Sequence, residues 1–189
     1  HLMDLTNPMH IATKSSKIDI TLEKDTESIS HKMSNYLSKG DVVFLYGEIG
    51  VGKTTFIKHL INYLQSKLNE KITEVPSPTF NIVYEYKIDE LIIHHYDLYR
   101  VKSEMELKNI GLFENHKESI TLIEWPEIIR EKPKNIIELN FNYEENLSKR
   151  SLIISSKYKK KFLMNLNNLI KLSGDASFRK FYRGDKSVV

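Results

Sequence analysis

One segment of the sequence has the residue types and spacing that bind a phosphate group. Residues 47–54 read GEIGVGKT and fit the pattern G-x-x-x-x-G-K-[ST]. In such a loop the glycines let backbone N–H groups turn toward the β-phosphate, the lysine bridges the β- and γ-phosphates, and the threonine hydroxyl ligates Mg²⁺. We therefore predict a nucleotide site here. The residues expected to form it are Gly47, Glu48, Ile49, Gly50, Val51, Gly52, Lys53, Thr54 and Thr55.

Two acidic residues follow apolar runs and are candidates for the metal ion that accompanies a nucleotide. Glu124 comes directly after Ser119–Ile123, and Asp97 comes directly after Leu91–Tyr96. A carboxylate at the carboxyl end of a strand beside a phosphate loop commonly holds Mg²⁺ or its water. Because the metal needs one such acid, the other is free to orient an attacking water or to sense the γ-phosphate. The alternative for either residue alone is a structural role in a helix cap or turn.

A strand before the phosphate loop and a helix after it must hold this site in place. Residues 41–46 (DVVFLY) form an apolar run that is typical of a strand covered on both faces. The segment 54–68 predicts an amphipathic helix. Its apolar face comprises Ile57, Leu60, Ile61, Leu64 and Leu68. Thr55 lies in the first turn, where its hydroxyl either reaches the α-phosphate or only caps the helix.

The remaining pattern predicts a mixed sheet. Two β-rich runs, 82–88 and 91–96, flank Asp89-Glu90 and indicate an antiparallel hairpin. A second hairpin, at an edge of the sheet, is expected from the alternating runs 136–143 and 151–155. The other expected elements are a strand at 18–22, a helix from about Asp25-Thr26 to Lys39-Gly40, a short helix at 103–109, and a helical turn from Pro126 that closes before Pro133. Together these elements predict a three-layer α/β domain of the P-loop NTPase-like class, with a mixed, mainly parallel sheet flanked by helices.

The composition limits the class of protein. The 189 residues are 40% hydrophobic and 28% charged, which is enough for one well-buried domain with appendages. The chain has no cysteine, which excludes a disulfide framework and thiol catalysis and suits a reducing cytoplasm. No apolar run approaches the length that crosses a bilayer, so we expect no membrane association.

The net charge of +3 hides a strong asymmetry along the chain. Residues 1–148 hold 17 Lys and Arg against 23 Asp and Glu, a net charge of −6, whereas residues 149–189 hold 11 against 2, a net charge of +9. An acidic body with a basic tail indicates nearness to nucleic acid, an acidic partner, or only a solvated surface.

Four motifs occur together in the order and at the spacing of one bacterial family. They are GEIGVGKT at 47–54, SPTF at 77–80, HYDLYR at 95–100 and IEWPE at 123–127. These linked motifs resemble TsaE, formerly YjeE, the P-loop ATPase family of tRNA threonylcarbamoyladenosine synthesis. The resemblance covers residues 18–156 and implies ATP and Mg²⁺ as cofactors.

The resemblance also implies roles for individual residues. Lys53 and Thr54 fall on the positions that bind ATP and Mg²⁺, and Glu124 falls on the glutamate that completes the metal site. Asp97 becomes the candidate for activating water or for coupling hydrolysis to a partner. Thr79 falls in a switch-like loop where it senses the γ-phosphate; the alternative is a rigid turn at Pro76 and Pro78 with a capping hydroxyl.

For the other residues of these motifs, both structural and functional roles are open. His95 is better explained as a packed or hydrogen-bonded histidine than as a general base, and the adjacent His94 shows no metal-ligand spacing. Trp125, the only tryptophan, either stacks on the switch-like loop or is a half-buried structural indole. In the family, an N-terminal strand-loop and a late hairpin loop close the nucleotide pocket. The residues that fall there are Glu23, Thr26, Lys149 and Arg150.

The family further implies that ATP hydrolysis is coupled to the TsaD–TsaB complex, which acts on tRNA, so that tRNA is met only indirectly. ATP turnover would reset that complex between cycles. The oligomeric state stays open. Two other functions are compatible with a phosphate loop: a small-molecule kinase, and a nucleotide-dependent binding switch with little turnover.

The C-terminal segment departs from the family pattern. Residues 158–172 predict a basic amphipathic helix with Phe162, Leu166, Leu169 and Ile170 on one face. Residues 174–183 (GDASFRKFYR) resemble the opening of aminoglycoside-phosphotransferase-like kinase domains, but no catalytic aspartate or metal-binding loop follows. We therefore expect a truncated stub without kinase activity. We divide the chain into 1–17 (a tag remnant and N-terminal segment), 18–156 (the P-loop ATPase domain) and 157–189 (the basic helix and stub).

Overall fold

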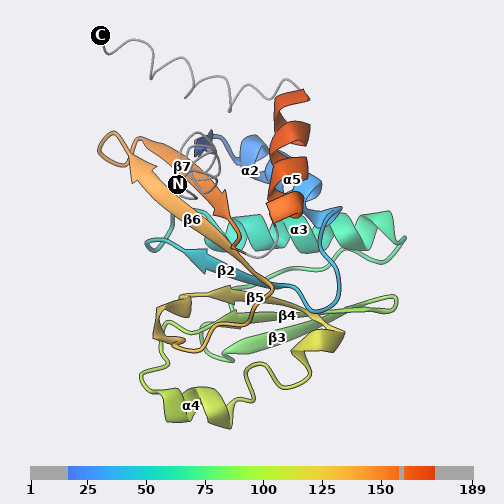
Figure 1. Ribbon diagram of the computed structural model, residues 1–189, viewed down its shortest axis with the longest axis vertical. Helices are drawn as coiled ribbons and strands as arrows, with labels where there is room; N and C mark the ends of the chain where they lie inside the picture. The colour runs from blue at the N-terminus through green and yellow to red at the C-terminus, as the bar shows by residue number, and fades with distance from the viewer. Residues whose placement is uncertain (1–16, 158–159, 173–189) are drawn as a thin grey trace, which may run out of the picture.

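Seven strands form one mixed sheet in the computed structural model, which describes residues 17–157 and 160–172 (Figure 1). The order across the sheet is β1-β7-β6-β2-β5-β4-β3. The strands are β1 Lys17–Asp19, β2 Val42–Tyr46, β3 Val83–Ile88, β4 Leu91–Asp97, β5 Ile120–Glu124, β6 Ile136–Glu144 and β7 Lys149–Ser155. The helices are α2 Glu23–Ser34, α3 Lys53–Lys67, α4 Glu104–Asn109 and α5 Lys160–Leu172, with short 3₁₀ helices η1 His116–Glu118 and η2 Pro126–Ile128.

The centre of the sheet is parallel and brings the predicted site residues to one edge. Strand β2 pairs in parallel with β5 and β6, and β4 pairs in parallel with β5. In this register Leu45 lies opposite Glu124, and Glu124 lies opposite Asp97. The carboxyl ends of β2, β4 and β5 therefore meet where the phosphate loop leaves β2.

The two faces of the sheet carry separate hydrophobic clusters, because successive strand residues point to opposite faces. Val43 and Leu45 of β2 pack with the apolar faces of α2, α3 and α5. Val42 and Phe44 pack on the other side, where α4 and the segments around it cover the sheet. Figure 1 shows α2, α3 and α5 together on one side and α4 apart from them. The prediction of a three-layer α/β domain with a mixed sheet is confirmed.

Two expectations about the N-terminal half and the late hairpin were wrong. Helix α2 runs over Glu23–Ser34 and does not extend to Lys39-Gly40. Gly40 does have a positive φ of 93°, but its N–H donates to the Ser119 carbonyl in the turn that starts β2. The β6–β7 hairpin is not at the edge of the sheet. Strand β6 pairs with β2 on its other side, and β1 covers β7, so that β1 is the edge strand.

Helix α5 packs on the core of the sheet domain. Leu166 and Ile170 are buried in the same cluster as the apolar faces of α2 and α3, and Leu163 joins them. This arrangement agrees with the predicted amphipathic face, except that the side chain of Phe162 lies outside the described residues. Residues 1–16, which include the expected tag remnant, and the segment 174–183 also lie outside them, so the division of the chain at residues 17 and 156 stays a prediction. None of the described helices is long and apolar enough to span a membrane.

Candidate nucleotide-binding site

The phosphate loop folds as the motif predicts, between the end of β2 at Tyr46 and the start of α3 at Lys53. Gly52 precedes the helix in the left-handed region with φ 119°, which favours glycine. Gly47 has φ 146°, and a Cβ there would lie 2.8 Å from the carbonyl oxygen of Phe141 and from the Val51 side chain. The neighbouring strand β6 therefore leaves no room for any other residue type at Gly47. Such a tight turn directs backbone N–H groups toward the centre of the loop.

Lys53 reaches back over the loop that precedes it. Its ammonium donates a hydrogen bond to the Gly47 carbonyl and lies 3.7 Å from the centroid of the Trp125 ring. Burial lowers the pKa of Lys53, and the carboxylates of Glu124, Glu127 and Asp97 oppose that shift. A largely buried ammonium held by one carbonyl and one aromatic ring is well placed to bind an anion, because an oxyanion is the stronger partner.

Thr54 and Glu124 form the contact that links the phosphate loop to the end of β5. The Thr54 hydroxyl donates to Glu124 Oε1 at 2.8 Å, and Glu124 is only 2% exposed. Hydroxyl and carboxylate oxygens are the ligands that Mg²⁺ prefers. Within residues 17–157 and 160–172, no three His, Asp or Glu side chains cluster to hold a metal on their own. A Mg²⁺ ion here would share phosphate oxygens and water with the nucleotide, and the Thr54–Glu124 pair fits that kind of site.

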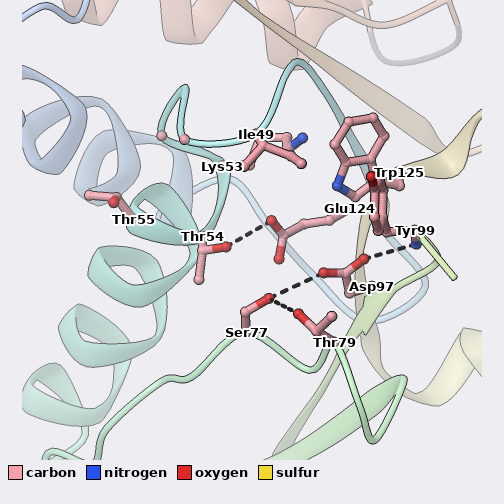
Figure 2. A pocket seen from close by; sticks show the side chains of 12 residues that line it. Ile49, Lys53, Thr54, Thr55, Ser77, Thr79, Asp97, Tyr99, Glu124 and Trp125 are labelled. Carbon is pink, nitrogen blue, oxygen red and sulfur yellow. Dashed lines mark hydrogen bonds between the residues drawn. The ribbon is translucent and has the colours of Figure 1, made fainter.

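Asp97 lies beside Glu124 but has different partners. Its Oδ1 accepts from the Tyr99 backbone N–H at 2.9 Å, and its Oδ2 accepts from the Ser77 hydroxyl at 3.1 Å. Ser77 and Thr79 are joined by a hydroxyl–hydroxyl hydrogen bond of 3.0 Å (Figure 2). The segment that carries the SPTF motif is thereby tied to a buried carboxylate at the end of β4.

These groups line one pocket of about 280 Å³. Figure 2 shows the acidic residues facing the helix start, with the Trp125 indole above them. The lining residues are Ile49, Gly50, Gly52, Lys53, Thr54, Thr55, Ser77, Thr79, Asp97, Tyr99, Glu124 and Trp125. The loop, both acids and the hydroxyl segment thus meet in a single cavity.

A family model matches a stretch of the chain that includes every residue lining this pocket. The model of the family described as "Threonylcarbamoyl adenosine biosynthesis protein TsaE" matches residues 20–152. The chain belongs to the TsaE family. Membership of this family, together with the P-loop NTPase-like fold, implies that the chain binds a nucleotide.

Curated TsaE proteins resemble the chain over most of their own length. A protein of Rickettsia bellii named "tRNA threonylcarbamoyladenosine biosynthesis protein TsaE" is 35% identical over 144 residues, which cover 76% of this chain and 96% of that protein. The protein of the same name from Aquifex aeolicus is 38% identical over 115 residues, 61% of this chain and 78% of that protein. The crystal structure of YdiB from Bacillus subtilis shares the fold, with a TM-score of 0.60 at 23% identity over 80% of this chain and 93% of that one.

The remaining residues predicted from the TsaE resemblance lie at different distances from the pocket. Thr55 lines it, and the helix N-cap is Gly52, so Thr55 is not the capping residue. Trp125 is half-buried and has a left-handed backbone, with φ 56°. Its ring lies 4.9 Å from that of Tyr99 between centroids. The guanidinium carbon of Arg100 lies 4.3 Å from the ring centroid of Phe80, whose side chain is exposed.

Four residues expected on the segments that close the nucleotide pocket, on its adenine or phosphate side, do not line this pocket. Glu23 accepts from the His59 ring at 3.0 Å, and Thr26 is buried within α2. The Lys149 ammonium donates to Glu145 at 3.0 Å. Arg150 lies in β7, and its backbone N–H donates to the Thr21 hydroxyl. Their role in nucleotide binding stays a prediction.

Within the loop itself, three predicted residues contribute backbone and packing. Gly47 provides the carbonyl that holds Lys53, the Glu48 carbonyl accepts from the N–H of Val51, and the Val51 side chain is buried. Sequence reasoning missed Ser77 and Tyr99 as site residues. Both lie inside motifs of the TsaE resemblance, Ser77 in SPTF and Tyr99 in HYDLYR. The hydroxyl of Ser77 was the one sequence feature that could have indicated a polar site residue there.

Proposed function

We propose that this chain is the ATP-hydrolysing component of the bacterial system that makes threonylcarbamoyladenosine in tRNA. The assignment to this biosynthetic process is supported by the curated relatives, which are named as tRNA threonylcarbamoyladenosine biosynthesis proteins. The observation that carries the proposal is the hydrogen bond from Thr54 of the phosphate loop to Glu124, with Asp97 beside it in register. This arrangement supplies a metal-binding pair and a second, separate carboxylate within one pocket.

In this proposal the phosphate loop binds and orients ATP. Backbone N–H groups of residues 47–52 and the start of α3 surround the β-phosphate. The Lys53 ammonium exchanges the Gly47 carbonyl for oxygens of the β- and γ-phosphates, which neutralises charge that moves toward the leaving group. Trp125 stays above the lysine and excludes water from that side.

The hydroxyl of Thr54 and the carboxylate of Glu124 would hold Mg²⁺. The bound ion supplies charge neutralisation between the phosphates. The chain's part is to present one hydroxyl oxygen and one carboxylate in a fixed relation, which their 2.8 Å hydrogen bond provides.

Asp97 is the residue we assign to the attacking water. Its carboxylate accepts a proton from the water as the water oxygen bonds to the γ-phosphorus. The bond from that phosphorus to the bridging oxygen breaks, and its electron pair leaves with ADP. Ser77 and the Tyr99 N–H fix the orientation of the carboxylate, and Thr79 links it to a segment that can respond to the γ-phosphate.

We further propose that turnover is coupled to a TsaD–TsaB-like complex in the cytoplasm, and that tRNA is reached only through that complex. A second candidate function, a nucleotide-dependent switch with little turnover, draws on one observation. Both oxygens of Asp97 already accept a hydrogen bond, Oδ1 from the Tyr99 N–H and Oδ2 from Ser77, which lies in the segment that contains Thr79. In a switch, Asp97 would transmit the state of the γ-phosphate without activating water.

Release of inorganic phosphate from Mg–ATP, with no added acceptor, tests the proposal. We expect slow release by the chain alone, faster release with TsaD–TsaB, and loss of both with Lys53→Ala. Lys58→Ala, an exposed change one turn further along α3, is the control and should release phosphate like the wild type. Phosphate transfer that requires a small-molecule acceptor would overturn the proposal in favour of a kinase. Partner binding that needs ATP without release of phosphate would favour the switch.

A further inference from the structure

His95 is a fully buried histidine whose ring is directed at the candidate metal ligand. It is 0% exposed, and its Nε2 lies 2.7 Å from Glu124 Oε2. Its other nitrogen, Nδ1, is buried without a hydrogen-bond partner among the described residues. The single polar contact of this ring is therefore the one to Glu124.

The sheet register explains how the two side chains meet. Strands β4 and β5 are parallel neighbours, with His95 opposite Leu122 and Asp97 opposite Glu124. His95 thus lies two residues before Asp97, on the same face of β4. From there its ring reaches Glu124 from within the sheet, whereas Thr54 reaches the same carboxylate from the phosphate loop.

The consequence is a carboxylate that is held at both oxygens. An ionised carboxylate only accepts hydrogen bonds, so the His95 Nε2–H donates to Oε2 while Thr54 donates to Oε1. Glu124 is nearly removed from solvent, and a buried carboxylate is costly unless such donors compensate it. With Oε2 engaged by His95, the plane of the carboxylate is fixed and Oε1 is turned toward Thr54.

His95 does not reach the nucleotide pocket itself. It is absent from the residues that line the cavity, which include Glu124 and Asp97. A role as general base is therefore excluded by position, and a role through Glu124 is left.

We propose that His95 is a positioning residue for the metal site, which sets the Mg²⁺ affinity of the nucleotide complex by orienting Glu124. This inference rests on the proposed function, because it takes Thr54 and Glu124 as the Mg²⁺ ligands. Partners of metal ligands commonly change metal affinity about 10-fold to 100-fold when they are lost.

The test measures nucleotide binding with and without Mg²⁺, not turnover. Trp125 is the only tryptophan and lies over Lys53, so its fluorescence reports ADP or ATP binding. The wild type, His95→Leu and His95→Gln are titrated with nucleotide in excess EDTA, and then with Mg²⁺ at fixed nucleotide. His95→Leu removes the donor and keeps an apolar side chain, whereas His95→Gln keeps an N–H donor on a side chain of similar length.

His94→Leu is the matched control. This neighbouring histidine contacts Ser119 and Glu85 through its two ring nitrogens, and makes no contact with Glu124. For His95→Leu we expect the Mg²⁺ concentration for half-maximal response to rise about 10-fold or more. Binding in EDTA should be unchanged, and both His95→Gln and His94→Leu should behave like the wild type.

Three results would overturn the inference. They are an unchanged Mg²⁺ requirement in His95→Leu, an equal loss of binding in EDTA and in Mg²⁺, and a failure of His95→Gln to restore the wild-type requirement. If His95→Leu does not fold by its thermal transition, His95→Asn replaces it, since its shorter side chain withdraws the donor from Glu124. A wild-type chain whose nucleotide binding ignores Mg²⁺ would instead contradict the proposed function itself.

Discussion

Two neighbouring carboxylates, one residue each from β4 and β5, have separate sets of partners in this pocket. Glu124 accepts from Thr54 and His95, whereas Asp97 accepts from Ser77 and the Tyr99 N–H. The apolar runs place both acids at strand ends without distinguishing them, and only the resemblance to TsaE assigns the metal to Glu124. The cross-strand contacts favour Glu124 as the metal ligand and leave Asp97 for the water.

Asp97→Asn tests this division of roles. The amide keeps the size of the side chain but is a much weaker proton acceptor, so we expect phosphate release to fall about 100-fold or more. Nucleotide affinity, measured by Trp125 fluorescence, should stay within a few-fold of the wild type. Asp89→Asn, in the exposed β3–β4 turn, is the control for loss of one carboxylate. Unchanged hydrolysis in Asp97→Asn would show that Asp97 only senses the γ-phosphate.

Among the elements, the phosphate loop depends on its contact with β6 as well as on its own sequence. The glycine pattern predicted the loop, but the reason for Gly47 is the Phe141 carbonyl 2.8 Å from its missing Cβ. That contact joins segments nearly one hundred residues apart, and a local motif does not reveal it. The same limit explains why the edge position of β1 was missed.

Gly47→Ala and Gly40→Ala form an informative pair, since both glycines have positive φ. At Gly40 the nearest atom to an added Cβ is 3.8 Å away, so only backbone strain of about 1 kcal/mol is expected. At Gly47 the clash should cost about 1–3 kcal/mol more and move the loop. We expect denaturant unfolding to show this difference, and nucleotide titration to show lost affinity in Gly47→Ala alone. Wild-type nucleotide affinity in Gly47→Ala would contradict the tight loop.

The packing of α2 against α3 carries a pH dependence through His31. Its ring stacks on Tyr63, with centroids 4.2 Å apart, and burial lowers its pKa from 6.5, opposed by Glu27 and reinforced by His59. A histidine with a lowered folded pKa binds fewer protons in the folded than in the unfolded state, so its contribution to stability falls as the pH falls below about 6.5.

We therefore expect the unfolding free energy of the wild type, relative to His31→Gln, to decrease between about pH 8 and about pH 5. Urea unfolding of both proteins across this range measures the difference, and the comparison cancels the titration of groups that the two share. A relative stability that increases on acidification would mean that the pairing of protonated His31 with Glu27 outweighs burial.

At the scale of the whole molecule, α5 is part of the packed domain. The periodicity of residues 158–172 predicted an amphipathic helix, and in the structure α5 packs against α2, within the hydrophobic cluster that also holds the apolar face of α3. The sequence could not supply this location, because an apolar face shows that a helix is covered but not by which element. The resemblance to a TsaE core that ends near residue 156 gave no reason to expect it.

Leu166→Ala tests the docking of α5. Leu166 is fully buried, so the substitution should lower the unfolding free energy by about 2–5 kcal/mol. Met164→Ala, at a side chain 61% exposed on the same helix, should change it by less than about 0.5 kcal/mol. Equal, small effects of the two changes in thermal or denaturant unfolding would show that α5 is not part of the cooperative unit.

The most direct test of the proposed partner-coupled ATPase function is a measurement of the threonylcarbamoyladenosine formed per TsaD in a reconstituted system. TsaD–TsaB, tRNA, the threonylcarbamoyl donor and Mg–ATP are supplied with the wild-type chain or with Asp97→Asn. We expect repeated turnover of TsaD with the wild type, and formation limited to a single tRNA per TsaD with Asp97→Asn or without the chain. Repeated turnover that is the same with and without this chain would contradict the account.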